Sequence, residues 1–374
     1  EWGYPALFPT YIANSFHMLL LPTQIADVGG PLLISALIGA ANLSVYETWR
    51  WVRGHRAPPK LILGGTLAAV ALALTYGSIR VAQIEARMDA APSLRVGIVQ
   101  VNMGIFAKWE EAKEGHRRHL EQSRQLEEEG ELDLLIWPES AYVANLPRRV
   151  PWSAAKVRGD LKSPMLFGGV SVERVDGQKR IYNTVFSMDA EGIVRSTYDK
   201  TFLLMFGEYL PLGETFPFLY ELSPNSGHFT KGSHVRPVTF GEWRISTPVC
   251  YEDILARFTR EMVREAKPHV LINLTNDAWF GDSQEPWIHL LLSKYRAIEH
   301  RRYLVRSTNS GVSAVIDPLG RVVARTGLMT RENLRAEIRM LEQDTIYTAL
   351  GDWPGWLSFL LLAWMLIQRR HAAQ

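Results

Sequence analysis

The 374 residues contain a single cysteine, Cys250, within the string RISTPVCYEDI. A cysteine attacks as the thiolate, and an unassisted thiol is only a few per cent ionised at neutral pH. Glu139 in LDLLIWPES and Lys200 in GIVRSTYDK each stand where an apolar, strand-like run ends. A carboxylate can take the thiol proton, and an ammonium can stabilise the negative charge of a tetrahedral intermediate. The three residues are therefore the parts of a metal-free site for acyl transfer.

Each of these residues also has a purely structural interpretation. A lone cysteine is commonly a small buried hydrophobe. Glu139 follows Trp137 and Pro138 and could cap a following helix. Lys200 could be a solvated loop residue. Residue types alone leave these alternatives open.

The wider pattern of motifs resembles a known family. WPES, YDK and VCYED occur in the order and at roughly the separations of the nitrilase, or carbon-nitrogen hydrolase, superfamily. FGEYLP from Phe206, NLTNDAWFG from Asn273 and RSTNSGVSAVIDPLG from Arg306 are similar to its apolipoprotein N-acyltransferase branch. The resemblance runs from about Leu94 to Thr326 and implies a four-layer α-β-β-α sandwich.

The resemblance also implies roles for individual residues. Cys250 would be the nucleophile, Glu139 the general base and Lys200 the oxyanion-stabilising cation. Glu208 would pair with the lysine and keep it charged. Two further supporting candidates are Tyr251 and Glu252, although Glu252 could instead begin a helix. Trp279 and Phe280 are the pocket candidates, and they are either core aromatics or walls of an acyl pocket. Asn276 and Asp277 are expected to fix a turn rather than to do chemistry.

The segment after Lys200 departs from the family pattern. Phe202 stands where a histidine is expected, and Met205 stands where a proline is expected. The apolar run from Phe202 to Phe206 is either a core strand or a lid that touches lipid. The departures leave the catalytic positions intact but affect the loop's shape and substrate preference.

Bulk composition excludes several classes of protein. Hydrophobic residues make up 47% and the formal net charge is +2, so neither disorder nor a nucleic-acid surface is indicated. One cysteine permits no intrachain disulfide and no CxxC metal site, and no cofactor or metal is expected. The chain begins at Glu1, so we expect a piece of a longer protein.

Apolar residues are concentrated at the two ends of the chain. Residues 1–30 are aromatic and proline-bearing, which favours an interfacial or re-entrant segment. Three membrane spans are predicted, at 31–52, 61–79 and 353–367. Basic clusters at 53–60 and 368–371 should be cytoplasmic by the positive-inside rule. A catalytic domain over 94–335 would then face the periplasm from the bacterial inner membrane.

The middle of the chain alternates strand-like and helix-like segments, which indicates an α/β fold. We predict helices within 108–130, 250–267 and 285–302, with β-branched strands between them.

Three functions remain open at this stage. The first is a membrane-bound acyltransferase that moves an acyl chain from a phospholipid, through a cysteine thioester, to the amine of a diacylglyceryl-cysteine lipoprotein. The second is a membrane-tethered amidase in which water replaces the amine. The third is a non-catalytic binding module, which the complete Glu139, Lys200 and Cys250 set argues against. The partners implied by the first are membrane lipids and lipoproteins, with no nucleic acid.

Overall fold

The computed structural model describes residues 8–104, 111–223 and 226–372. Within these ranges the strands form two sheets, one of eight strands and one of six. The first has the order β14-β1-β2-β5-β6-β7-β4, with β3 pairing beside β5. Its strands are β1 (Ser93–Gln100), β2 (Leu134–Ile136), β3 (Tyr142–Pro147), β4 (Trp152–Ser153), β5 (Met165–Val175), β6 (Gln178–Met188), β7 (Ile193–Asp199) and β14 (Glu332–Arg339).

The second sheet has the order β13-β12-β11-β10-β9-β8. Its central strands β9, β10 and β11 are parallel to one another, while β8, β12 and β13 pair antiparallel at its edges. The strands are β8 (Val238–Phe240), β9 (Trp243–Ser246), β10 (Val270–Thr275), β11 (Leu304–Thr308), β12 (Ala314–Ile316) and β13 (Val322–Arg325).

The two sheets pack face to face because each strand alternates its apolar side chains between two buried faces. Both β1 and β10 show the alternation. The shared core between the sheets takes Leu94, Val96 and Ile98 from β1 and Val270, Ile272 and Leu274 from β10. The opposite faces of the same strands carry Val99 and Leu271, which join two separate outer cores.

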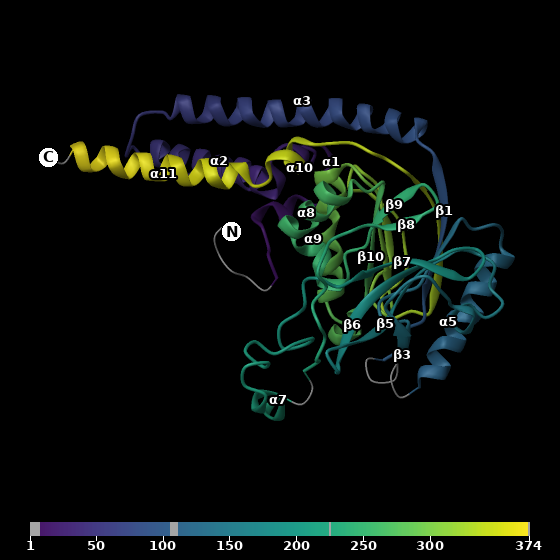
Figure 1. Cartoon of the computed structure of the whole chain (residues 1–374). Coiled ribbons are helices and arrows are strands. Elements are labelled where there is room, and N and C mark those ends of the chain that lie inside the picture. The colour runs from purple at the N-terminus through teal and green to yellow at the C-terminus, as the bar shows by residue number, and fades with distance from the viewer. Residues whose placement is uncertain (1–7, 105–110, 224–225, 373–374) are drawn as a thin grey trace.

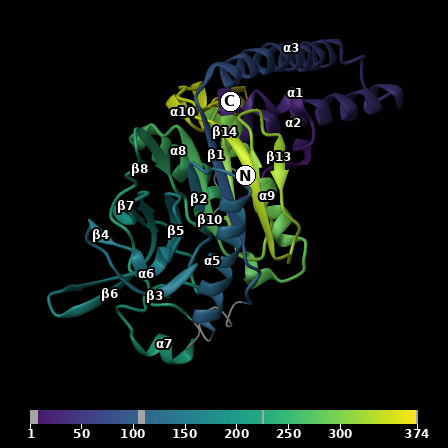
Figure 2. The ribbon, with the colours of Figure 1, turned by 90° about the vertical axis from the view of Figure 1, so that its right-hand side faces the viewer.

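Helices cover the two outer faces. Helix α5 (Ala112–Glu128) packs on the first sheet through Leu126. Helices α8 (Ala256–Ala266) and α9 (Glu285–His300) cover the second through Val263 and Leu290. Figure 1 shows α5 on one side of the paired sheets and α8 and α9 on the other, and Figure 2 looks onto the α5 side. The predicted four-layer α-β-β-α sandwich is confirmed, and so are the three predicted helices, within a few residues at each end.

The terminal apolar segments form long helices beside the sandwich. They are α2 (Ala26–Val52), α3 (Lys60–Ala90) and α11 (Trp353–Ala372), and Figure 1 shows them running side by side. Among the described residues, α2 and α3 are long and apolar enough to cross a membrane by length and composition. α11 carries Gln368, Arg369 and Arg370 near its C-terminal end, and its passage through a membrane stays a prediction.

Short elements join this helical part to the sandwich. They are η1 (Ile12–Phe16), α1 (Leu20–Thr23) and α10 (Ile346–Leu350). A buried polar contact reinforces the junction: Asp27 at the start of α2 accepts hydrogen bonds of 2.9 Å from Arg80 on α3 and from Arg301 just after α9. The long helices are therefore held against the sandwich by ion pairs as well as by packing.

The loop after β7 is irregular. Phe202–Phe206 contains no strand, and one isolated bridge joins Met205 to Tyr209. The core-strand interpretation of this run is therefore wrong. Phe202 and Phe206 are 44% and 65% exposed, so the run does not bury its aromatic side chains. Two short helices complete the described fold, α6 (Ala155–Arg158) and α7 (Phe218–Leu222), the second of which belongs to this loop region.

Candidate active site

Cys250 lies at the first residue of a tight 3-10 turn, η2 (Cys250–Ile254), just beyond β9. Its φ of 52° is in the left-handed region, which costs free energy for a residue with a Cβ atom. The neighbouring strand holds this conformation, because the Asn273 side chain on β10 donates to the carbonyls of Pro248 and Cys250 at 3.0 Å. The turn thus places the thiol at the edge of the second sheet, facing the first.

Glu139 follows β2 after Trp137 and Pro138, and it is buried. A Cβ atom at Gly168 on β5 would approach the Pro138 carbonyl oxygen at 2.6 Å and the Glu139 Cα at 2.7 Å. Glycine at that position lets the glutamate turn pass close over the sheet. The Glu139 Oε1 accepts a hydrogen bond of 2.7 Å from Asn183 on β6.

Lys200 follows β7 directly and its side chain is 1% exposed. Its Nζ lies 2.8 Å from Glu208 Oε2 and 3.7 Å from Glu139 Oε1. Burial by itself lowers the lysine pKa, but the Glu208 and Glu139 carboxylates outweigh burial and hold the pKa above its ordinary value. The lysine is therefore a permanent cation, as oxyanion stabilisation requires.

Asn183 joins the two carboxylates. Besides Glu139, its Nδ2 donates to Glu208 Oε1 at 3.0 Å. The amide thus fixes the general-base candidate and the lysine's partner relative to each other. An asparagine within the buried strand NTVFSM was the available sequence signal, but sequence reasoning gave it no role.

The Cys250 thiol is partly buried, and burial raises its pKa well above the ordinary range. Glu139 raises that pKa further, whereas Lys200 lowers it, so both groups lie within electrostatic range of the sulfur. The resting form is therefore the neutral thiol. Nucleophilic attack consequently needs a base to remove the proton, which is the part a nearby carboxylate can play.

The Glu252 carboxylate is fully buried and accepts hydrogen bonds from four donor groups. It accepts backbone hydrogen bonds from Thr201 and Phe202 at 2.7 Å and from Val249 at 2.8 Å, and it also accepts from the Tyr198 hydroxyl. Burial raises its pKa to about 7. This carboxylate therefore joins the loop after Lys200 to the turn that begins with Cys250, rather than merely beginning a helix.

The aromatic candidates surround the same turn. Tyr251 is buried and packs edge-on against Phe8, with 5.5 Å between the ring centroids. Its ring is tilted relative to that of Phe202, at 6.1 Å between the centroids. Phe280 is half-buried and contacts Phe8. Trp279 is 61% exposed, which excludes it from the core. Its place in a substrate pocket stays a prediction.

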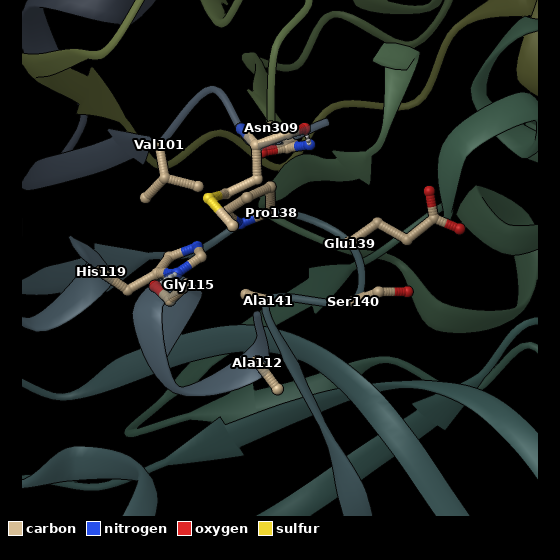
Figure 3. Close-up of a pocket in the computed structure, with 10 residues that line it drawn as sticks. Val101, Ala112, Gly115, His119, Pro138, Glu139, Ser140, Ala141 and Asn309 are labelled. Atoms are coloured by element: carbon tan, nitrogen blue, oxygen red, sulfur yellow. Dashed lines mark hydrogen bonds between the residues drawn. The ribbon is translucent and has the colours of Figure 1, made fainter. Parts of the chain in front are cut away.

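A small cavity lies behind the glutamate. Its volume is about 10 Å³, room for about one water molecule. Figure 3 shows the Glu139 carboxylate pointing away from His119, on the far side of the turn that lines this cavity. Substrate-sized space lies elsewhere, in two hollows of about 250 and 580 Å³ beside the loop after Lys200. They share Tyr209, Glu214 and Phe229 in their walls.

The structure therefore brings together Cys250, Glu139, Lys200, Glu208 and Glu252, which come from four separate parts of the sequence. Among the described residues, no group of three or more His, Cys, Asp or Glu side chains has the arrangement of a metal site. The arrangement suits covalent catalysis by a thiol, with a carboxylate base and an ammonium beside it.

Comparison with known proteins places this geometry in context. Residues 95–346 match the family model described as carbon-nitrogen hydrolase. The apolipoprotein N-acyltransferase of Geobacter metallireducens is 33% identical, over 89% of this chain and 64% of that protein. Apolipoprotein N-acyltransferase 2 of Leptospira interrogans is 30% identical, over 96% of this chain and 73% of that protein. The chain thus spans about two thirds of the length of these relatives.

A solved structure shows the same fold. Nit3 of Saccharomyces cerevisiae, a member of branch 10 of the nitrilase superfamily, superposes with a TM-score of 0.50 at 17% identity. The match covers 69% of this chain and 94% of Nit3. The two proteins therefore share the fold over most of this chain, and part of this chain is unmatched.

Proposed function

Because the chain belongs to the carbon-nitrogen hydrolase family, within its apolipoprotein N-acyltransferase branch, we propose that it is a membrane-bound N-acyltransferase. It takes a fatty acyl chain from a phospholipid and passes it to the N-terminal amine of a diacylglyceryl-cysteine lipoprotein. The observation that carries the proposal is the buried Glu139–Lys200–Glu208 group beside the single thiol, in a chain that also bears long apolar helices.

In the first step Glu139 takes the Cys250 proton while the sulfur attacks the ester carbonyl carbon of the phospholipid. Lys200 stabilises the negative charge that develops on the carbonyl oxygen. The ester C–O bond then breaks, and the proton on Glu139 passes to the departing lysophospholipid oxygen. An acyl thioester on Cys250 remains.

In the second step the lipoprotein amine attacks the thioester carbonyl. Glu139 takes a proton from the amine, the C–S bond breaks, and the sulfur regains a proton as the amide is released. The chemistry is ping-pong and uses residues of this chain alone. A membrane-tethered amidase would use the same residues with water in place of the amine, and the apolar helices and the relatives favour the transferase.

The loop after the catalytic lysine supports a lipid-facing role. Phe202, Met205 and Phe206 are all more than 40% exposed, and Phe202 lines the smaller of the two hollows described above. Leu212 and Leu222 extend this exposed apolar surface farther along the loop. Exposed apolar patches of this kind mark contact with lipid or protein. We assign the segment 202–222 to contact with the membrane during substrate entry.

The test is the intact mass of detergent-solubilised protein after incubation with phosphatidylethanolamine. Wild-type protein should gain the mass of one acyl chain, which hydroxylamine removes because it cleaves thioesters. Cys250→Ala should gain nothing. Subsequent addition of a diacylglyceryl-cysteine peptide should move the acyl group to the peptide as a hydroxylamine-stable amide.

The two candidate enzymes give different products in this experiment. Release of free fatty acid, with no acylated peptide, would favour the amidase. A folded wild-type protein that forms no adduct would contradict both. The inactive Cys250→Ala variant, verified to be folded, serves as the matched control.

A further inference from the structure

A second charged cluster lies behind the nucleophile, outside the set of groups that do the chemistry. His289 on α9 places Nε2 at 3.0 Å from Asp253 Oδ1 and Nδ1 at 2.9 Å from Asp277 Oδ1. Arg306 on β11 hydrogen-bonds Asp253 and lies 3.6 Å from Asp277 Oδ2. All four side chains are at most 2% exposed.

The imidazole of His289 must be protonated to satisfy this arrangement. A neutral imidazole carries one N–H, so one of its nitrogens would turn a lone pair toward a carboxylate oxygen. Both nitrogens of an imidazolium donate, so each carboxylate accepts one hydrogen bond from the ring. Burial and Arg306 lower the pKa of His289, but Asp277 and Asp253 outweigh them and raise it to about 9. Two carboxylates therefore face two cations, and the cluster is neutral.

The cluster connects two segments that border the thiol. Asp253 belongs to the turn η2, which begins with Cys250. Asp277 begins the next such turn, η3 (Asp277–Phe280), which carries Trp279. Asp277 is also close enough to Cys250 to raise the pKa of its thiol. His289 and Arg306 hold the two turns together from the helix and the strand beneath them.

The backbone around Asp277 is shaped for this contact. A Cβ atom at Gly311 would lie 2.3 Å from Asp277 Oδ2 and 2.8 Å from its Cβ, so only glycine leaves room for the carboxylate. The left-handed conformation of Cys250 also requires that the surrounding structure hold it in place. A rigid anchor three residues after the nucleophile meets that requirement.

We infer that His289, Asp253, Asp277 and Arg306 form a positioning clamp that locks the Cys250 turn against the Asp277–Phe280 turn, so that the sulfur stays within reach of Glu139. The inference rests on the proposed role of Cys250 as nucleophile. None of the four touches substrate in this scheme, so they act through the position of the thiol. Loss of the clamp should slow the attack of the sulfur while leaving phospholipid binding intact.

The test uses His289→Gln and Asp277→Asn, with His300→Gln as matched control. His300 lies on the same helix, is equally buried, and bonds Thr348 on α10 at 2.8 Å rather than the nucleophile turn. Thioester formation is followed by mass, and kcat is separated from KM for phosphatidylethanolamine. In both test variants kcat should fall by about 10- to 100-fold, as for a sub-ångström to ångström misplacement of a reacting group. KM should stay within about threefold, as expected when binding contacts are untouched.

A second measurement needs no substrate. Alkylation of Cys250 by iodoacetamide also requires removal of the thiol proton, so it should slow in His289→Gln and keep its wild-type rate in His300→Gln. Asp277→Asn is left out of this measurement, because the Asp277 carboxylate raises the thiol pKa and its loss would by itself speed alkylation. This arm remains informative if the wild-type protein forms no acyl adduct, so failure of the proposed function and failure of the clamp are distinguishable. Folded test variants with wild-type kcat, together with wild-type alkylation of His289→Gln, would overturn the clamp. Failure of both test variants to fold would assign the cluster to stability alone and would also overturn it.

Discussion

Replacement of Glu208 by glutamine removes one charge from the centre of the site and changes little in shape. Glu208 Oε2 accepts from Lys200 at 2.8 Å and from the Leu204 backbone at 2.9 Å, while Oε1 accepts from Asn183 at 3.0 Å. A glutamine can direct its oxygen to only one side. If the oxygen stays with the lysine, the new NH₂ group faces the NH₂ group of Asn183.

Asn183 cannot relieve this conflict by turning over. Its NH₂ group also donates to Glu139 Oε1 at 2.7 Å, and a flipped amide would direct its oxygen at that carboxylate. One buried donor is therefore left unsatisfied, at a cost of about 1–3 kcal/mol. Breaking a buried ion pair costs about 3–5 kcal/mol when a charge is left alone, and here Glu139 at 3.7 Å retains part of the lysine's compensation. We expect a net loss of about 3 kcal/mol.

The catalytic loss should be larger than the loss of stability suggests. Without Glu208, the lysine's nearest carboxylate is Glu139 at 3.7 Å, so the ammonium is held less firmly where it would stabilise the oxyanion. Loss of one oxyanion-stabilising group costs about 10²–10³ in rate, so we expect thioester formation to slow by about 100-fold in Glu208→Gln.

The assay combines denaturation in detergent with the rate at which the acyl adduct appears by mass. Glu221→Gln is the control, because it removes an exposed carboxylate on α7 of the same loop region. A Glu208→Gln protein that loses less than about 1 kcal/mol and acylates at the wild-type rate would refute the reasoning. So would an equal loss of rate in Glu221→Gln.

Three further predictions concern other parts of the site. Gly168→Ala should push the Glu139 turn off β5, because the new methyl group would lie 2.7 Å from the Glu139 Cα; adduct formation should fall at least tenfold, and an unchanged rate would contradict the close packing. The pKa of His289 is raised from 6.5 to about 9, so the stability that its charge contributes is fully present below pH 6.5 and is lost as pH rises through 9. Over this interval the unfolding free energy of wild type should drop by about 3 kcal/mol more than that of His289→Gln. Parallel pH curves for the two proteins would exclude the imidazolium. Phe206→Asp should lower activity on lipid vesicles but not on a short soluble acyl ester, because Phe206 is 65% exposed and its replacement leaves the core intact; equal activity on vesicles would exclude the lipid-facing role.

The sequence by itself identified the chemical groups and the class of fold. One cysteine, with Glu139 and Lys200 each at the end of an apolar run, indicated thiol chemistry, because catalytic side chains commonly lie just after the end of a β-strand. Alternating strand and helix patterns indicated α/β layers, and the family resemblance supplied the four-layer arrangement that the structure confirms. Long apolar runs with few charges indicated the long helices α2 and α3, since length and composition can be read from the sequence alone.

Only the tertiary structure decided which polar residues support the site. Asn183 and His289 lie in segments whose local pattern is that of an ordinary strand and an ordinary helix. Their roles arise from hydrogen bonds to residues 44 positions away in one case and 36 in the other. Local propensity depends on near neighbours along the chain, whereas these contacts depend on how two sheets and a helix pack. The ion pair of Lys200 with Glu208, by contrast, was predicted through the family pattern, and the structure supplies its 2.8 Å geometry.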